Sequence, residues 1–233
     1  MAMSLVLYEL LGKDDLRFSP FAWRVRLALA HKGLVPDEIV PCRFTEKHKF
    51  AFSGQDKVPV LVDGPATIAD SWKIACYLED SYAQHPSLFG GAVGRGLAKT
   101  LNYYCDGQLH PAMARIILGD VFASVDEVDR DYFRKTREVR FGMAIEAMHA
   151  ERERHVPAWN AVLLPARLTV RDQPFLSGEA PAYPDYILFG TFMWARGTSA
   201  FPLLAKDDPL YAWRDRMLDL FGGMARKAKG HPL

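Results

Sequence analysis

Short apolar runs alternate with helical patterns over the first forty residues. The run from Ser4 to Glu9 is apolar, with β-branched and aromatic members, which predicts a buried strand. Ser19-Pro20 opens a helical pattern that ends at His31-Lys32-Gly33, with serine as N-cap, proline at the first helical position and glycine to reverse the chain. A second strand is predicted at residues 38–42, where Pro41 indicates either an edge strand or the end of the strand. Strand, helix and strand together predict a parallel βαβ unit.

The pattern continues with a polar stretch, a hairpin and a helix. Residues 43–57 are polar and predict a short helix or an irregular loop. Val58-Pro59 precedes an apolar run, and the proline predicts either the first residue of a strand or a turn before it, where a cis bond can form. Asp63-Gly64 predicts a tight hairpin with a return strand at residues 66–69. Asp70-Ser71 predicts a second helix N-cap.

The rest of the chain has helical periodicity and no convincing strand. Residues 85–96 are rich in glycine and carry a proline, which predicts a linker between domains at 1–84 and 97–233. The fold class expected is α+β for the first domain, in β-α-β-(α)-β-β-α order, and all-α for the second. Five helical segments are predicted: Leu97–Leu118, Val128–Arg154, Pro157–Arg171, Tyr183–Arg196 and Pro209–Lys227.

Composition and charge exclude several classes of protein. Lys+Arg 29 against Asp+Glu 28 leaves a formal charge of +1, and no basic stripe with interleaved aromatics appears, so nucleic acid and membrane surfaces are not expected partners. No apolar run of spanning length and no signal-peptide pattern are present. Cys42, Cys76 and Cys105 form no CxxC pair and the histidines show no ligand spacing, so free thiols in a reducing cytoplasm and no metal are expected.

Four motifs, in order, resemble those of the cytosolic glutathione transferases, and the resemblance spans nearly the whole chain. They are Val58-Pro59, Asp70-Ser71, Phe175-Leu176-Ser177-Gly178 and Pro184-Asp185-Tyr186-Ile187-Leu188. The resemblance implies a thioredoxin-like βαβ-ββα domain followed by a helical bundle. It also implies glutathione as co-substrate, a hydrophobic aromatic small molecule as second substrate, and a homodimer.

Further segments resemble one subgroup, the bacterial lignin β-etherases and the related fungal etherase-like (FuA-type) transferases. These segments are Phe18–Arg24, His31–Gly33, Asp70–Ala75 and Asp207–Leu210. A resemblance to the zeta class is visible in Trp23–Arg26. Zeta-class isomerases carry a cysteine where this chain has Phe21, which argues against that isomerase activity.

One position departs from the pattern of the helical domain. A serine or threonine usually caps the helix three residues before the aspartate, whereas this chain has Ala182 before Asp185. Loss of such a cap typically costs ~1 kcal/mol, so either the fold is less stable or another group provides the cap.

Ser19 is the predicted catalytic residue. From the residues alone it would be a structural cap, but the glutathione thiol must become a thiolate to attack an electrophile. A hydroxyl donor at the positive end of a helix stabilises that anion, and the resemblance places Ser19 there. Tyr8 is the rival hydroxyl, for which packing within the strand is the favoured interpretation.

The resemblance assigns the remaining glutathione contacts to separate motifs. Val58, next to Pro59, would offer its backbone N–H and C=O to the cysteinyl part. Asp70 would pair with the γ-glutamyl ammonium and Ser71 with its carboxylate, at a helix N-terminus. The glycyl carboxylate needs a cation, and the sequence leaves three alternatives: Lys57, Lys47 and His48.

The second substrate would lie between the domains, against an aromatic wall. Its candidates are Phe18, Phe21, Tyr103, Tyr104, Met113, Ile117 and Trp194. The function predicted is activation of the glutathione thiolate for attack on aromatic electrophiles, with β-aryl ether cleavage as one form of that reaction. Alternatives are a non-catalytic ligand-binding protein of the same fold, and a glutathione-dependent isomerase or peroxidase.

Overall fold

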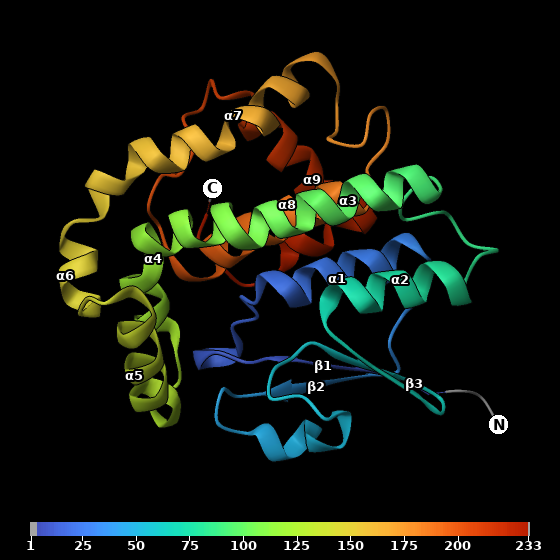
Figure 1. Cartoon of the computed structure of the whole chain (residues 1–233), viewed down its shortest axis with the longest axis horizontal. Coiled ribbons are helices and arrows are strands. Elements are labelled where there is room, and N and C mark those ends of the chain that lie inside the picture. The colour runs from blue at the N-terminus through green and yellow to red at the C-terminus, as the bar shows by residue number, and fades with distance from the viewer. Residues whose placement is uncertain (1–3, 233) are drawn as a thin grey trace.

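The computed structural model describes residues 4–232 and has a mixed sheet in its N-terminal half (Figure 1). The sheet has strand order β2-β1-β3-β4; β1 and β2 are parallel, and the other neighbouring pairs are antiparallel. The elements of this half are β1 (Leu5–Leu10), η1 (Lys13–Asp15), α1 (Pro20–His31), β2 (Glu38–Cys42), η2 (Lys47–Ser53), β3 (Val60–Asp63), β4 (Ala66–Ala69) and α2 (Ser71–Ser81). The α+β topology and the edge position of β2 are as predicted.

The C-terminal half of the described chain is helical and covers α1 and α2 on the side away from the sheet (Figure 1). None of its helices is long and apolar enough to cross a membrane, and the same holds for the other described helices. The elements are α3 (Ala92–Tyr104), the π-helical turn η3 (Cys105–Leu109), α4 (His110–Ser124), η4 (Glu127–Asp129), α5 (Arg130–Phe141), α6 (Ile145–Ala150), η5 (Arg152–His155), α7 (Val156–Asp172), α8 (Tyr183–Thr198) and α9 (Pro209–Lys227).

Helix α1 is buried on two sides, because it lies between the sheet and α8 (Figure 1). Two glycines of α8 allow its close approach to the start of α1. A Cβ at Gly190 would lie 2.4 Å from the carbonyl oxygen of Pro20, and one at Gly197 would lie 2.8 Å from Cβ of Phe18. Helix α8 therefore packs directly on the segment that contains Ser19.

Two of the predicted helical segments have different bounds in the structure. Helix α3 begins at Ala92, inside the predicted linker, where a Cβ at Gly94 would collide with the carbonyl oxygen of Phe89 at 1.9 Å. The glycine that indicated a linker is thus required by a close backbone contact. The segment predicted at 128–154 is divided after Phe141, where Gly142 adopts a positive φ of 66° and ends α5.

The carboxylate of Asp185 binds the N–H groups around Ala182, where the side-chain cap is missing. This buried group accepts hydrogen bonds from the N–H groups of Ala182 at 3.2 Å, Leu176 at 2.7 Å and Ser177 at 3.2 Å, and from the indole N–H of Trp213 at 2.9 Å. One carboxylate satisfies the start of α8 and the loop before it. The first N–H of α8, that of Tyr183, is bound instead by the carbonyl oxygen of Leu88 at 2.9 Å, so of the two alternatives a group other than a side chain at position 182 binds the start of the helix.

Candidate functional site

Ser19 is the N-cap of α1, and its side chain is partly free to bind a ligand. Its Oγ accepts a hydrogen bond from the N–H of Ala22 at 3.2 Å, which stabilises the first turn. The hydroxyl proton has no acceptor among residues 4–232, so the group can still donate. The rival hydroxyl, that of Tyr8, lies on β1, and its ring packs edge-on against Phe52 at 5.3 Å.

A buried ionic network holds the loop before Ser19. Glu9 is fully buried on β1, and it accepts hydrogen bonds from Arg17 Nη1 and Arg26 Nε, both at 2.7 Å. The carbonyl oxygen of Arg17 accepts the indole N–H of Trp23 at 2.7 Å. A buried carboxylate requires such partners, and here they come from the loop and from α1. The strand, the loop and the helix therefore hold Ser19 in one position.

The Val58-Pro59 peptide bond is cis, and it leads directly to the second helix N-terminus. The carbonyl oxygen of Pro59 accepts the N–H of Asp70 at 3.4 Å. Asp70 Oδ1 caps α2 by accepting the N–H groups of Trp72 at 3.0 Å and Lys73 at 3.1 Å, while Oδ2 has no hydrogen bond within the described residues. Asp70 is thus a helix cap with one carboxylate oxygen left for a ligand.

Ser71 has the same combination of a structural contact and a free group. Its carbonyl oxygen accepts the hydroxyl of Tyr183 from α8 at 3.0 Å, which joins the two halves of the chain. Its own side-chain hydroxyl makes no hydrogen bond with any described residue. Asp70 and Ser71 therefore leave both a carboxylate oxygen and a hydroxyl at one helix N-terminus.

The three candidate cations differ in what already surrounds them. The Nζ of Lys47 lies 3.5 Å from Asp56 and 5.3 Å from the ring centroid of Tyr132. His48 and Lys57 are exposed, and neither makes an ion pair with a described residue. Lys57 directly precedes Val58, so its backbone adjoins the site while its charge remains free.

The predicted aromatic wall does not form as one surface. Phe18 and Met113 are buried in the core, as is Ile117, and Tyr103 is 64% exposed on the outside of α3. The hydroxyl of Tyr104 donates to the carbonyl oxygen of Val162 at 2.7 Å, and both residues line a cavity that does not include Ser19. These placements correct the prediction, which did not account for the direction of each side chain on its helix.

Phe21 and Trp194 both pack against the ring of His110, a residue that was not predicted. The ring centroid of His110 lies 5.2 Å from that of Phe21 and 5.8 Å from that of Trp194, both edge-to-face. Burial, and then the charge of Arg24, hold the pKa of His110 well below its usual value. The signal for His110 in the sequence was weak, because a lone histidine in a helical pattern is common in protein cores.

Arg24 of α1 joins the two halves of the chain at this point. Its Nη1 donates to Asn102 at 2.9 Å and its Nη2 to Asp106 at 2.8 Å, and Nη2 lies 3.3 Å from Sγ of Cys105. Cys105, Asp106 and His110 have ligand atoms close enough together for a metal ion. The buried guanidinium already occupies these acceptors and repels a second cation, so the cluster is an interface between the halves.

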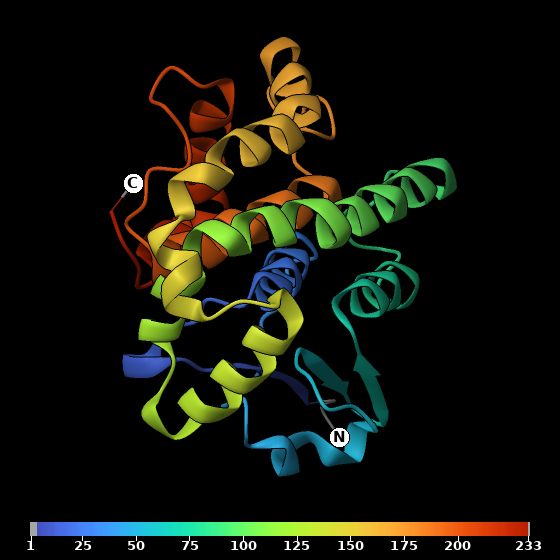
Figure 2. The same ribbon diagram turned by 60° about the vertical axis from the view of Figure 1, so that its left-hand side comes forward.

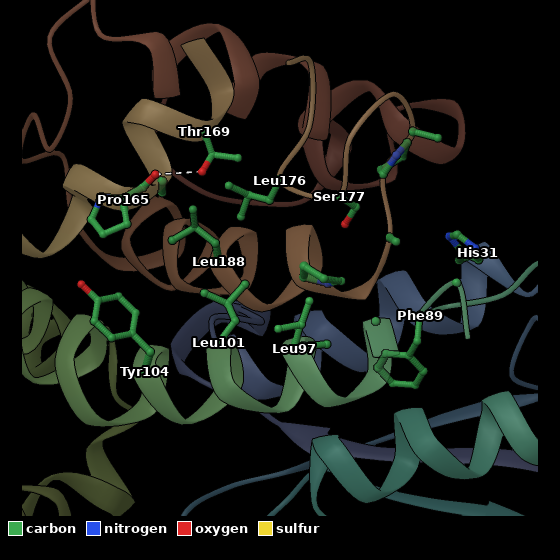
Figure 3. Close-up of a pocket in the computed structure, with 18 of the residues that line it drawn as sticks. His31, Phe89, Leu97, Leu101, Tyr104, Pro165, Thr169, Leu176, Ser177 and Leu188 are labelled. Atoms are coloured by element: carbon green, nitrogen blue, oxygen red, sulfur yellow. Dashed lines mark hydrogen bonds between the residues drawn. The ribbon is translucent and has the colours of Figure 1, made fainter. Parts of the chain in front are cut away.

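A cavity lies at the other end of α1, beside His31. Its volume is about 740 Å³, and it is bordered by α3, α7 and the chain from Leu176 to Leu188, with His31 at one side (Figure 3). Leu97, Leu101, Leu176 and Leu188 give it an apolar lining (Figure 3). Ser19 is not among its lining residues, so the cavity is separate from the candidate site.

Two family models match the chain. The glutathione S-transferase N-terminal domain matches residues 18–81, and the glutathione S-transferase C-terminal domain matches residues 96–201. A zeta-class glutathione S-transferase from Euphorbia esula is 40% identical over 75 residues, which cover 30% of this chain and 33% of that protein. The matches span about a third to a half of the length of the curated relatives.

Solved structures share the fold over nearly the whole chain. The glutathione S-transferase CsGST63524 of Ceriporiopsis subvermispora, in complex with glutathione, has a TM-score of 0.81 and 22% identity, covering 94% of this chain and 96% of that one. The β-etherase LigF from Sphingobium sp. strain SYK-6 has a TM-score of 0.67 and 17% identity, covering 97% and 99%. With both family models matching in order, the chain belongs to the glutathione S-transferase family.

Proposed function

We propose that this chain is a glutathione transferase in which Ser19 stabilises the glutathione thiolate for attack on a hydrophobic aromatic electrophile. The observation that carries the proposal is the state of the Ser19 hydroxyl, whose oxygen caps α1 while its proton has no acceptor among the described residues. The donor and the positive end of the helix act on the same point in space. Each unit of thiol pKa depression corresponds to ~1.4 kcal/mol, which one charged hydrogen bond supplies.

The rest of glutathione would be bound at the second helix N-terminus. The free oxygen of Asp70 is suited to the γ-glutamyl ammonium, and the hydroxyl of Ser71 to its carboxylate. We assign the backbone N–H and C=O of Val58, which directly precedes Pro59, to the cysteinyl part. Lys57 is our choice for the glycyl carboxylate, because it adjoins Val58 and its charge is unpaired in the described structure.

The thiolate would displace a leaving group from the electrophile. A bond forms from sulfur to carbon, the bond from that carbon to the leaving group breaks, and the group departs with its electron pair. In a β-aryl ether the bond that breaks is C–O, and a phenolate leaves. The fold shared with LigF supports ether cleavage as the finer proposal, and the half-buried Phe21, two residues after Ser19, offers an aromatic ring for the electrophile.

The cysteines of the chain do not compete with glutathione as nucleophiles. Burial raises the pKa of the Cys42 thiol to about 11 and also raises those of Cys76 and Cys105. A raised thiol pKa leaves little thiolate near neutral pH, so the reactive sulfur must come from the co-substrate. Three free thiols also support the proposal of a reducing, cytoplasmic location.

A homodimer is the proposed assembly, supported by exposed apolar side chains on α3 and α7. Val93 and Leu97 on α3, and Leu164 and Leu168 on α7, are exposed although they are large and hydrophobic. Such a patch on two neighbouring helices typically marks a protein interface. Light scattering on a sizing column would contradict the proposal if it gave the mass of a single chain.

A glutathione-dependent turnover screen tests the function. It compares β-aryl ether model compounds, a halonitrobenzene and organic peroxides with the purified protein. Release of a phenol from the ethers alone would establish ether cleavage, and turnover of the halonitrobenzene would establish general conjugation. Turnover of peroxides alone would contradict the proposal in favour of a peroxidase. Retention on immobilised glutathione with no turnover would favour the non-catalytic binding protein.

A further inference from the structure

The segment after α4 reaches back to the N-terminal half. Asp126 precedes η4, and its carboxylate accepts a hydrogen bond from Nη2 of Arg43 at 3.0 Å. Asp129 ends η4, and its fully buried carboxylate accepts three bonds: the N–H groups of Phe44 and Thr45, each at 3.0 Å, and the Thr45 hydroxyl at 2.6 Å. One short stretch of the C-terminal half is therefore bonded to the chain just after β2.

Helix α5 continues the same contact surface. The ring of Phe133 meets that of Phe44 edge-to-face at 5.5 Å, and Tyr132 lies under the Nζ of Lys47 at 5.3 Å. Asp129, at the N-cap of α5, and Phe133 lie four residues apart, so their contacts form one surface against residues 44–45. Figure 2 shows α5 standing beside the sheet, above the segment that leads into η2.

The hydrogen bonds of Asp129 fix the position of residues 44–45 relative to η4. The carboxylate has no ion pair with any described residue, and its three donors all come from residues 44–45. A buried charge is costly unless hydrogen bonds compensate it, so residues 44–45 must stay in register with η4. The C-terminal half thereby sets the position of a loop that belongs to the N-terminal half.

The loop held in this way supports the approach to Ser19. The ring of Phe44 packs on that of Phe18, with centroids 6.5 Å apart, and Phe18 directly precedes Ser19. Phe18 has little room to move, because a Cβ at Gly12 would lie 2.4 Å from its ring and one at Gly197 would lie 2.8 Å from its Cβ. A shift of Phe44 would therefore be transmitted through Phe18 to the N-cap of α1.

We propose that Asp129 is a positioning residue for glutathione. It holds residues 43–47 against η4 and α5, and through Phe44 and Phe18 it holds Ser19 in register with the second helix N-terminus. The C-terminal half thus contributes to the affinity for glutathione without touching it. The inference rests on the proposed function, since it concerns the same site.

The test compares Asp129→Ala and Asp129→Asn with the control Asp131→Ala, an exposed aspartate two residues further along. Calorimetry gives the glutathione Kd, and steady-state kinetics give the KM for glutathione and for a halonitrobenzene. Asp129→Ala is expected to weaken glutathione binding and raise its KM about tenfold, with the halonitrobenzene KM within about twofold. Asp129→Asn should recover part of the loss, because its amide oxygen still accepts, and Asp131→Ala should match the wild type.

The outcomes separate this inference from the proposed function. A folded Asp129→Ala protein that binds glutathione as the wild type does would overturn the inference alone. A wild-type protein that does not bind glutathione would overturn the proposed function. Should Asp129→Ala fail to fold, Thr45→Val removes a single donor, and we expect it to weaken glutathione binding about threefold. Unchanged binding in that variant would also overturn the inference.

Discussion

The two ends of α1 differ in nearly every physical property that matters for chemistry. The Ser19 end is tightly packed, lies beside a buried ionic network, and keeps a free hydroxyl proton. The His31 end borders the cavity of about 740 Å³. There, the ring nitrogens of His31 are engaged by the hydroxyl of Tyr186 at 2.6 Å and the carbonyl oxygen of Ser87 at 3.0 Å.

The difference shows why cavity size does not locate this reaction. A thiolate needs a donor and a positive potential, and a helix provides the positive potential only at its N-terminus. Burial, and then the neighbouring Lys32, lower the pKa of His31, so the C-terminal end carries no imidazolium at neutral pH. The cavity at the His31 end offers apolar surface, whereas the Ser19 end offers the hydroxyl and the helix N-terminus that a sulfur anion requires.

The largest effect is expected from removing the donor at the Ser19 end. Ser19→Ala loses a charged hydrogen bond to the thiolate and should lower kcat/KM roughly a hundredfold, with glutathione affinity changed much less. Ser19→Thr keeps a hydroxyl and serves as the matched control. Wild-type kcat/KM in Ser19→Ala, measured with the best electrophile of the turnover screen, would leave Ser19 as a cap only.

A smaller effect is expected at the second helix N-terminus. Asp70→Ala removes both the cap of α2 and the oxygen proposed for the γ-glutamyl ammonium. We expect about tenfold weaker glutathione binding and a loss of about 1 kcal/mol in the free energy of unfolding. Asp70→Asn retains a capping oxygen, so denaturant unfolding should show that the lost stability is recovered. Calorimetry should show that the affinity for glutathione is not recovered. Equal glutathione binding by all three proteins would contradict the ligand role.

The two histidines allow the ends of α1 to be compared by pH. His110 is neutral in the folded protein, so stability should be lost as pH falls below about 6.5, where the unfolded chain binds a proton that the folded chain rejects. The slope reaches at most about 1.4 kcal/mol per pH unit for one proton. Below about pH 6.5, the denaturant midpoint should fall less steeply with decreasing pH in His110→Gln than in His31→Gln. The reason is that, of the two, only His110 is shifted well below its usual pKa. A denaturant midpoint that depends on pH in His110→Gln as it does in the wild type would contradict this assignment.

The smallest effect on activity is expected from the cavity at the His31 end. Leu97→Glu places a charge on the apolar rim of the cavity, which should weaken a dimer. Glutathione turnover per folded chain should stay within about twofold, because Ser19, Asp70 and Ser71 are not among the residues that line this cavity. A loss as large as that of Ser19→Ala would show that the two ends are coupled through the assembly.

Much of the N-terminal half could be predicted because its signals are local. The cap at Ser19, the hairpin after Asp63 and the edge strand at Pro41 depend on atoms within four residues of one another. In the helical half, the ends of the helices were predicted less accurately, because Gly94 and Gly142 have opposite effects on a helix. One permits a close contact inside a helix, and the other adopts a positive φ that ends a helix.

Contacts between the halves were beyond the reach of the sequence. Tyr103 and Tyr104 are neighbours in the chain, but successive helical positions point about 100° apart, so one is exposed and the other lines a cavity. His110 gave no distinct signal, and neither did Asp129, because an aspartate near a helix start is usually a cap. The domain limits at 1–84 and 97–233 stay a prediction.

By itself, the sequence determined the order of the elements, the capped start of α1 and the two helix N-termini that a glutathione site needs. Those features follow from backbone hydrogen bonding over a few residues. Only the tertiary structure decided which side chains meet across the halves: Arg24 with Asp106, His110 with Phe21, and Asp129 with Phe44. Their positions depend on how α4, α5 and α8 pack, and packing is a property of the whole chain.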